Sequence, residues 1–406
     1  MLARHQSIEK VSILLLCSCW AVLLLNLAVF PAISHAQMQQ QTKPTGSIPT
    51  PEPAIPAILA AFNRYEVVAM PEAHGMKDVD DFILTLIRDP AFSEKVNDIA
   101  VECGNSLYQP TLDRYIAGEN VPFAEVQKVW RNTTQPMCGM SGFFEQFYPL
   151  VRAINQKLPP GNRLRVLAGD PPIDWDQVKS PDIGKFTDRD ASIASLMEKE
   201  VLSKHRKALM LFGIFHLMHG GGVGSGNAVA IYEKHYPNTT FVISDLGIYD
   251  TNLPVLSSSA FASWIAPSLA WSKGTWLGAL RLSYFYPPTI WTDKDCNIYN
   301  EFPKNEQKPM ADLVDAFLYL GPQDLRLKEP IPADIALDVE YMTELLRREK
   351  LSGMPGAGTV NGLDQQIVDG VGSPVFVVPK LQDTMLFFPF IKQNCLDRKA
   401  HSSAHQ

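Results

Sequence analysis

The stretch Tyr65-Glu-Val-Val-Ala-Met-Pro-Glu-Ala-His-Gly75 decides the fold that this chain is expected to adopt. Its apolar run at residues 67–70 is typical of a short strand buried on both faces. Pro71 has no N–H to donate to a sheet, so we expect the strand to end there. Glu72 and His74 then follow the carboxyl end of the strand, where open α/β sheets bind ligands. A carboxylate and an imidazole at this spacing can act as a general base with its orienting partner, or as two metal ligands.

Strand-like and helix-like segments alternate on both sides of this stretch. Apolar runs typical of strands occur at residues 65–70, 98–103, 164–169, 208–212, 240–244 and 316–320. Signals for helices occur at residues 77–88, in a polar tract at 107–157, from the capping-box pattern Thr187-Asp-Arg-Asp190 onward, at 226–235 and at 334–349. The alternation predicts an α/β fold with a mainly parallel sheet flanked by helices on both faces. We expect one α/β domain over residues 57–350, with a helical insertion, and an irregular C-terminal extension over 351–406.

Ionisable side chains stand at the ends of four successive expected strands. Glu72 and His74 follow the first, Glu102 closes the second, Asp170 closes the third, and His216 follows the fourth. Because the carboxyl ends of parallel strands share one edge, we expect these groups to converge. Each of them alone could be a helix cap or a hydrogen-bonded core residue, but the set favours a functional site. Asp170 is an additional candidate, weaker than the other four.

Two arginines in the tract after the second strand are further candidates. Arg114 and Arg131 could each recognise an anion or a carboxylate through the planar guanidinium. The simpler alternative is an ion pair, for example between Arg114 and Asp113 or Glu119. The sequence slightly favours the ion-pair alternative.

The N-terminal part of the chain resembles an export signal followed by a linker. Residues 1–36 have a basic start, an apolar run at 11–30 and small residues before a cleavage site after Ala36, which predicts a signal peptide and an exported protein. The alternative is an uncleaved membrane anchor, because about 20 apolar residues can span a bilayer. Residues 37–56 are rich in Gln, Pro and Thr, which predicts a disordered linker.

Charge and cysteine content exclude several classes of protein. The net charge of −7 argues against nucleic acid and anionic membrane surfaces as partners. The expected partner is a small-molecule or peptide substrate. Removal of the signal leaves four cysteines, which allow three disulfide pairings: Cys103, Cys138, Cys296 and Cys395. No Cys-x-x-Cys occurs after the signal, so a zinc ribbon or a thioredoxin-like site is not expected. Cys103 could equally be a small buried residue after a strand.

The order and spacing of three motifs resemble the erythromycin esterase/ChaN-like superfamily, which includes the TIKI proteases. The motifs are Pro71-Glu-Ala-His74, Glu102 and Gly213-Ile-Phe-His216. Members of the superfamily carry Gly-Glu-x-His or Gly-Glu-x-x-His after the first strand, a Glu at the end of the second, and Gly-x-x-His after a later one. The resemblance covers about residues 60–250, with a possible final strand at 314–320, and it implies the same α/β sheet. Pro71 departs from the family pattern, which has Gly at that position.

The resemblance implies a hydrolase of an ester, lactone or peptide bond. In that case His74 would be the general base and Glu102 would orient it. Glu72 and His216 would complete the site for water, or would bind a divalent metal ion together with His74. No Gly-x-Ser-x-Gly motif is present, so a serine hydrolase is not expected.

The resemblance also implies two alternatives. One is a ChaN-like protein that binds haem or iron without hydrolysis, with His74, His216, His219 or Tyr115 as the iron ligand. The chain lacks Cys-x-x-Cys-His, so such haem would be bound non-covalently. The other alternative is a structural member that has lost activity, and Pro71 is the feature that favours it.

Overall fold

The computed structural model describes residues 46–352, apart from residues 73, 180–187, 222–225, 248–260, 287–289, 293–294, 301–307, 323–324, 328 and 330, together with residue 396. The signal peptide, its cleavage site after Ala36 and the linker up to residue 45 lie outside the described residues. So does nearly all of the expected C-terminal extension. None of the described helices combines the length and apolar character that crossing a membrane requires.

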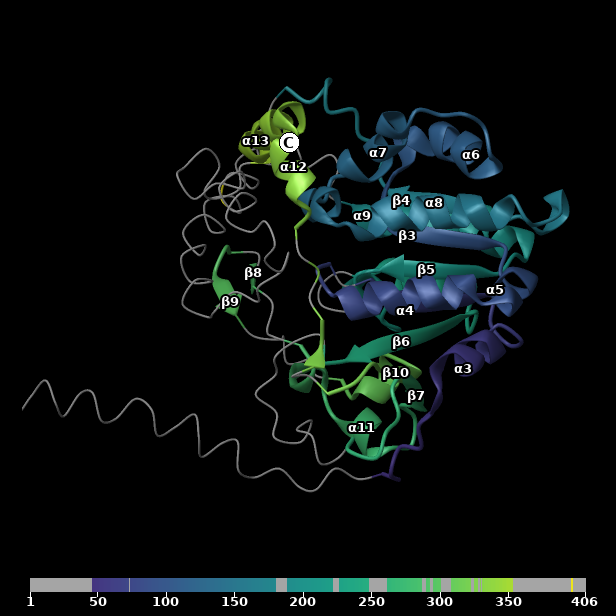
Figure 1. The fold of residues 1–406 in the computed structure, drawn as a ribbon. Helices are drawn as coiled ribbons and strands as arrows, with labels where there is room; N and C mark the ends of the chain where they lie inside the picture. Colours follow the sequence, from purple (N-terminus) through teal and green to yellow (C-terminus); the bar gives the residue numbers. More distant parts are fainter. Residues whose placement is uncertain are drawn as a thin grey trace, which may run out of the picture. The chain divides into compact units, whose positions relative to one another are not determined.

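The centre of the fold is one eight-stranded sheet with the order β1-β7-β10-β6-β2-β5-β3-β4 (Figure 1). The strands are β1 (Glu52–Pro53), β7 (Ser268–Trp271), β10 (Ala316–Tyr319), β6 (Thr240–Leu246), β2 (Val67–Pro71), β5 (Ala208–Phe212), β3 (Asp98–Asn105) and β4 (Arg165–Asp170). From β10 to β4 every neighbouring pair is parallel, whereas β7 is antiparallel to both of its neighbours, β10 and β1. This confirms the predicted α/β class with a mainly parallel sheet. A separate antiparallel pair consists of β8 (Ile290–Thr292) and β9 (Ile298–Asn300).

Helices cover both faces of the sheet, and each face has its own apolar core. One core packs around α3 (Ala54–Ala61), α4 (Lys77–Arg88), α5 (Pro90–Lys95), α6 (Gln109–Ala117), α7 (Phe123–Arg131) and α8 (Phe143–Asn155). The other packs around α9 (Arg189–Glu200), α10 (Ala228–Tyr232) and α11 (Trp276–Ala279). Because side chains alternate along a strand, Val68 and Met70 enter the first core while Val67 and Ala69 enter the second. The central strands are therefore apolar throughout, as the sequence predicted.

The connections contain single turns of 3-10 helix. They are η1 (Ser106–Tyr108), η2 (Pro136–Met140), η3 (Pro160–Asn162), η5 (Leu202–Lys204), η6 (Ile214–His216), η7 (Leu282–Tyr284) and η9 (Met310–Asp312). One of them, η6, follows β5 at the carboxyl edge of the sheet and carries His216, a residue of the site described below.

Three boundaries differ from the sequence expectations. The linker does not extend to residue 56, because β1 pairs with β7 and α3 begins at Ala54. The helix expected from Thr187 begins at Arg189, and the side chain that caps it belongs to Asp188. The helix expected at residues 226–235 is shorter, since α10 ends at Tyr232 after a cap from Asn227. Caps from Asp188 and Asn227 thus set the starts of the two helices, and pairing with β7 sets the end of the linker.

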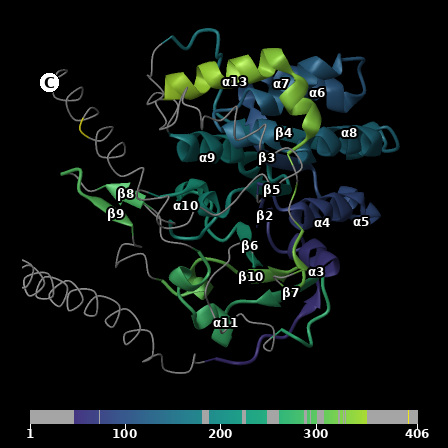
Figure 2. The ribbon, with the colours of Figure 1, turned by 60° about the vertical axis from the view of Figure 1, so that its left-hand side comes forward.

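The segment after β10 crosses the carboxyl edge of the sheet and ends in α12 (Ala333–Leu337) and α13 (Val339–Ser352) (Figure 1). We call the described residues from Arg326 to Ser352 the strap. Arg326 pairs with Asp245 at the end of β6. At the far end, Arg348 donates a hydrogen bond to the carbonyl of Arg131, the last residue of α7, so that α13 lies beside α7 (Figure 2). The strap therefore ties the C-terminal part of the described chain to both sides of the edge.

Candidate functional site

Four neighbouring strands bring the predicted residues to one edge of the sheet. The order β2-β5-β3-β4 places the carboxyl ends of these strands side by side, and Pro71 pairs with Phe212 in register. One ligand atom each from Glu72, His74 and Glu102 lies within 4.8 Å of the others. Nε2 of His216 is 3.9 Å from Oε1 of Glu102. The structure thus brings together all four residues that the sequence singled out.

Pro71 does not interrupt the hydrogen bonding between β2 and β5 that leads to Glu72. It is the last residue of β2, and the backbone N–H of Glu72 donates a hydrogen bond to the carbonyl of Phe212, with an N–O distance of 3.1 Å. The ladder between β2 and β5 therefore continues for one residue past the proline. The backbone at Glu72 is held by this bond despite the departure from the family pattern.

Alternation along β3 places Glu102 on the face opposite Val101 and Cys103, which enter the first core. The register of β3 against β4 shifts over the stretch between Val101 and Asn105. Within it, Gly104 lets β3 approach β4 closely, since a Cβ added there would lie 2.7 Å from the Cα of Ala168. The close approach leaves no room for a side chain, which explains the glycine at position 104.

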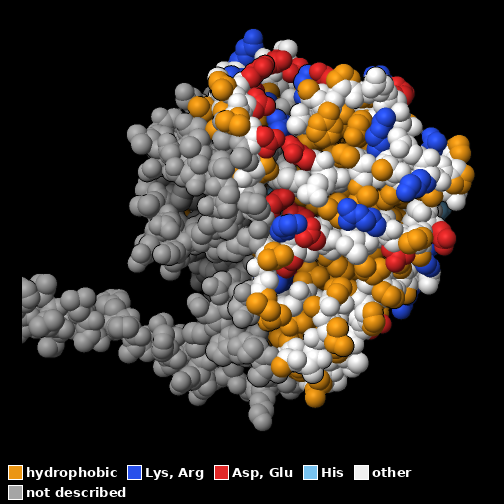
Figure 3. All heavy atoms as spheres, in the orientation of Figure 1, with side chains coloured by type: hydrophobic (Ala, Val, Ile, Leu, Met, Phe, Trp, Pro, Cys, Tyr) orange, Lys and Arg blue, Asp and Glu red, His pale blue; other side chains and the backbone are white. Residues whose placement is uncertain are grey.

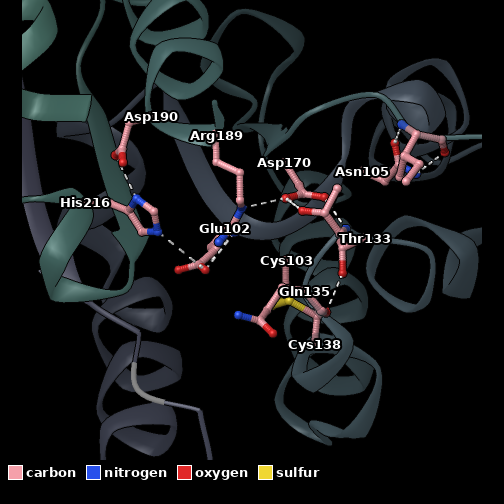
Figure 4. Close-up of polar contacts among 12 residues, drawn as sticks. Glu102, Cys103, Asn105, Thr133, Gln135, Cys138, Asp170, Arg189, Asp190 and His216 are labelled. Carbon is pink, nitrogen blue, oxygen red and sulfur yellow. Dashed lines mark hydrogen bonds and ion pairs between the residues drawn. A yellow bond between two sulfur atoms is a disulfide. The ribbon is translucent and has the colours of Figure 1, made fainter. Parts of the chain in front are cut away.

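Glu102 is buried and fully hydrogen-bonded. Its Oε1 accepts from Nη2 of Arg189 at 2.8 Å (Figure 4). Its Oε2 accepts from the backbone N–H of Gly213 at 2.6 Å. Burial raises the pKa of this carboxyl, but the charges of Arg189, His216 and His74, together with the Gly213 N–H, outweigh burial and lower the pKa to about 2. Glu102 is therefore a fixed negative charge at neutral pH.

Arg189 connects Glu102 to Asp170, which is the additional residue that the sequence proposed. Nε of Arg189 donates to Oδ1 of Asp170 at 3.1 Å. Asp170 also accepts from the backbone N–H and the hydroxyl of Thr134, at 2.5 and 2.6 Å. Burial raises the pKa of Asp170, although Arg189 and Thr134 oppose the shift. Asp170 lies behind Arg189 and acts on the site by holding this cation in place.

His216 is oriented by a carboxylate that the sequence did not identify. Its Nδ1 lies 2.7 Å from Oδ1 of Asp190, which also accepts the backbone N–H of Ala228 at 2.8 Å. A hydrogen bond from Nδ1 to a carboxylate fixes the ring and leaves Nε2 as the acceptor. Nε2 is too far from Glu102 for a direct hydrogen bond, and 18% of the side chain is exposed. Figure 4 shows His216 between Asp190 and Glu102.

His74 is paired with Glu72 rather than with Glu102, contrary to the expected arrangement. Nδ1 of His74 is 3.1 Å from Oε2 of Glu72. The contact is an ion pair by distance, but neither that nitrogen nor either oxygen of Glu72 has an aligned hydrogen-bond partner among the described residues. Burial lowers the pKa of His74, but the charges of Glu72 and Glu102 outweigh burial and Arg189 and raise the pKa to about 9. His74 is therefore protonated at neutral pH in this arrangement.

The chemistry of the donors suits a divalent cation. Glu72, His74 and Glu102 each offer one donor atom within 4.8 Å of the others. Both oxygens of Glu72 are buried and have no hydrogen-bond partner among the described residues. This set contains Glu102 in place of the predicted His216. A second group, formed by His74, Cys103 and Cys138, is unsuited because the two sulfurs form a disulfide. Oxygen and imidazole donors in this number match the usual ligands of catalytic zinc or manganese sites.

Four other predicted residues do not reach the site. Arg114 forms an exposed pair with Glu119 at 2.8 Å, which is the ion-pair alternative. Arg131 pairs with Glu145 and Asp338 and stacks on the ring of Tyr341, so it anchors the strap. Two candidate haem ligands are engaged elsewhere. Tyr115 lies under Arg152, and His219 is bonded through both ring nitrogens.

The residues that position Glu102 and His216 were not predicted from the sequence. Arg189 and Asp190 stand at the start of α9 and were interpreted only as part of a capping box. Their position after a strand at the carboxyl edge was the one signal that could have identified them. Thr134 and Glu329 gave no such signal, because each comes from a connection without periodicity.

Comparisons with known proteins give similarities of fold. No family model and no curated protein matches the chain in sequence. Similar solved structures include a Bacillus cereus protein, with 10% identity over 68% of this chain and 94% of that one and a TM-score of 0.42. They also include erythromycin esterase EreC in its open conformation, with 8% identity over 66% and 94% and a TM-score of 0.41. ChaN of Campylobacter jejuni, a structure with bound haem, has 12% identity over 47% and 85% and a TM-score of 0.29. Both kinds of protein named by the sequence resemblance are thus among the similar structures, but similarities this weak identify no substrate.

Proposed function

We propose that this chain is a hydrolase that adds water to an ester, lactone or peptide bond at the carboxyl edge of its sheet. The observation that carries the proposal is the Asp190–His216 pair facing Glu102. It places a partly exposed imidazole between one carboxylate that orients it and a second that is fixed as a negative charge. This is the arrangement that general-base activation of water requires.

His216 would be the general base. With Nδ1 held by Asp190, its Nε2 is free to accept a proton from water, and the imidazolium that forms lies between Asp190 and Glu102. This differs from the role expected for His74, because His74 has Glu72 as its close partner and already carries a proton. His74 would instead donate a hydrogen bond to an oxygen of the substrate.

Glu72, His74 and Glu102 would hold a divalent ion if the chain binds one. When bound there, such an ion supplies positive charge that polarises a carbonyl oxygen. The roles of the surrounding side chains stay the same: Arg189 holds Glu102, and Asp190 orients His216.

The test uses a panel of small esters, lactones and peptides, with and without a chelator. His216→Ala and Glu102→Gln should each lower kcat/KM by about 100-fold or more, the usual contribution of general-base catalysis. Their effects should not add, because the residues act as one unit. His235→Ala is the matched control, since His235 also pairs with a carboxylate but is exposed and lies outside the site.

Full turnover by His216→Ala on a substrate of the wild type would contradict the assignment. Haem binding without hydrolysis, lost in His74→Ala, would instead identify the ChaN-like alternative. Two of the iron ligands expected for that alternative, Tyr115 and His219, are engaged in structural interactions.

A further inference from the structure

Glu329 reaches the site from the strap, a part of the chain that the motif resemblance does not cover. Its backbone N–H donates a hydrogen bond to the carbonyl of Gly75, the residue after His74, at 2.8 Å. Its side chain is buried, and Oε2 accepts from the hydroxyl of Ser141 at 3.0 Å. The backbone contact thus fixes Glu329 beside the turn that carries His74, while Ser141 holds one oxygen of its carboxyl group.

The second carboxyl oxygen has room beside a glycine. A Cβ added at Gly142 would lie 3.2 Å from Oε1 of Glu329. Any larger residue at position 142 would crowd this oxygen. Ser141 and Gly142 therefore hold one oxygen and leave space at the other.

The surroundings of Glu329 contain more negative than positive charge. Glu72 at the end of β2 and Asp80 on α4 are buried carboxyls, and no oxygen of either has a hydrogen-bond partner among the described residues. Glu72 has His74 as a close partner at 3.1 Å, whereas Asp80 and Glu329 form no ion pair among the described residues. The charge on either of these two carboxyls therefore disfavours ionisation of the other.

The cations on the same side already have partners. Lys77 of α4 pairs with Asp81 at 2.7 Å, and Arg326 of the strap pairs with Asp78 and Asp245. Burial is the largest cause that raises the pKa of Glu329, and the charge of Glu72 raises it further. The hydrogen bond from Ser141 and the charge of Lys77 oppose the shift, but the pKa still rises to about 7. For Asp80, burial and then the charges of Glu329 and Glu72 raise the pKa well above its ordinary value.

We propose that Glu329 is the general acid of the site, a strap-borne carboxylic acid that gives its proton to the group that leaves during hydrolysis. The inference rests on the proposed hydrolase function. Water forms a new bond to the acyl carbon and gives one proton to His216. The bond from that carbon to the leaving oxygen or nitrogen breaks, and the leaving atom takes the proton of Glu329. Transfer of the proton from His216 back to Glu329 through solvent restores both groups.

The first experiment compares leaving groups. Glu329→Gln keeps the shape of the side chain but has no acidic proton to give. For substrates with a poor leaving group, such as an alkyl ester, it should lower kcat by about 100-fold. For substrates with a good leaving group, such as a nitrophenyl ester, the loss should be less than about 5-fold, because such a group departs without a proton. The fall in kcat above about pH 7 should be present in the wild type and absent in the variant.

Asp338→Asn is the control for the strap itself, because Asp338 pairs with Arg131 and touches no residue of the site. It should loosen the strap without changing the ratio between the two substrates. Equal losses on both substrates in Glu329→Gln, or an unchanged fall above pH 7, would overturn the proposal and leave Glu329 as a structural contact.

A second measurement does not depend on hydrolysis. Carbon NMR of protein labelled at the glutamate carboxyl should show one resonance that titrates near pH 7 and is missing in Glu329→Gln. Its absence would overturn the proposal even if the chain is a hydrolase. A wild type that hydrolyses no substrate of the panel would contradict the hydrolase and with it the role as general acid.

Discussion

Arg189 shows how much of the site depends on one buried cation. Its guanidinium contacts the carboxylates of Glu102 and Asp170, and only 19% of its side chain is exposed. Arg114 makes an Arg–Glu contact of the same 2.8 Å length, but with 58% of its side chain exposed. The two Arg–Glu contacts have the same length, but Arg189 is more buried and also holds Asp170, so its loss should cost more.

We expect Arg189→Met to lower the free energy of unfolding by about 3 kcal/mol, because two buried carboxylates would lose their cation. Arg114→Met should lower it by less than about 1 kcal/mol, as is usual for exposed pairs. Urea denaturation at neutral pH measures both. Similar losses in the two variants would show that Arg189 is not a buried structural charge.

At the scale of elements, the strand ends determine where the site residues lie. Close approach between neighbouring strands occurs again at Gly169 of β4, where an added Cβ would lie 2.7 Å from the carbonyl oxygen of Val101 and still closer to the ring of Phe212. Gly161, in η3, has no neighbouring atom within 4 Å of such a Cβ. The same substitution therefore meets a crowded environment in one case and an open one in the other.

Gly169→Ala should destabilise the protein by about 2 kcal/mol, a typical cost of overpacking, and should reduce activity by displacing the end of β3. Gly161→Ala should change stability by less than about 0.5 kcal/mol. Thermal unfolding, together with the ester assay, distinguishes the two. A stable and fully active Gly169→Ala would mean that β3 and β4 can separate without affecting Glu102.

The residues at the strand ends were predictable from the sequence, whereas the side chains that contact them from other elements were not. Apolar runs that stop at Glu72, Glu102 and Asp170 place these residues at one edge once the sheet is parallel. The pairing of His74 with Glu72 depends on side-chain directions in a turn, which no periodicity encodes. Asp190 contacts His216 across 26 residues, and Glu329 contacts Ser141 across 188. Such contacts follow from tertiary packing alone.

At the scale of the whole described chain, the second half adds strands to the sheet that the first half forms. The sequence left most of residues 251–406 without a role, but β7 and β10 extend the sheet and the strap crosses its carboxyl edge. On the described part of the face in Figure 3, Lys and Arg side chains are scattered among acidic and apolar ones. The expected small-molecule or peptide substrate stays a prediction.

His219 joins three parts of this assembly and should make the stability depend on pH. Its ring bonds Glu233 after α10 and Asp315 before β10, each at 2.9 Å. Burial lowers the pKa of His219, but these two carboxylates raise it from 6.5 to about 9. The charged form is favoured in the folded state, so its stabilisation is complete below about pH 6.5 and is lost as the pH rises through about 9.

The expected contribution is on the order of 2 kcal/mol. His219→Gln should therefore be less stable than the wild type at about pH 6 and should lose less stability between about pH 7 and 9. Denaturation at a series of pH values measures this. His235→Gln, at an exposed histidine, should leave the pH dependence unchanged.

The disulfide between Cys103 and Cys138 has a consequence for the unfolded chain. It closes a loop across a sequence separation of 35 residues that contains α6 and α7. A cross-link of this span removes conformational entropy from the unfolded ensemble, worth about 3–4 kcal/mol in the chain-entropy model. Cys103 directly follows Glu102, so one end of the cross-link lies next to a buried carboxylate of the site. Renaturation with the disulfide intact would therefore begin with the end of β3 already joined to the segment after α7. Under reducing conditions that advantage would be lost.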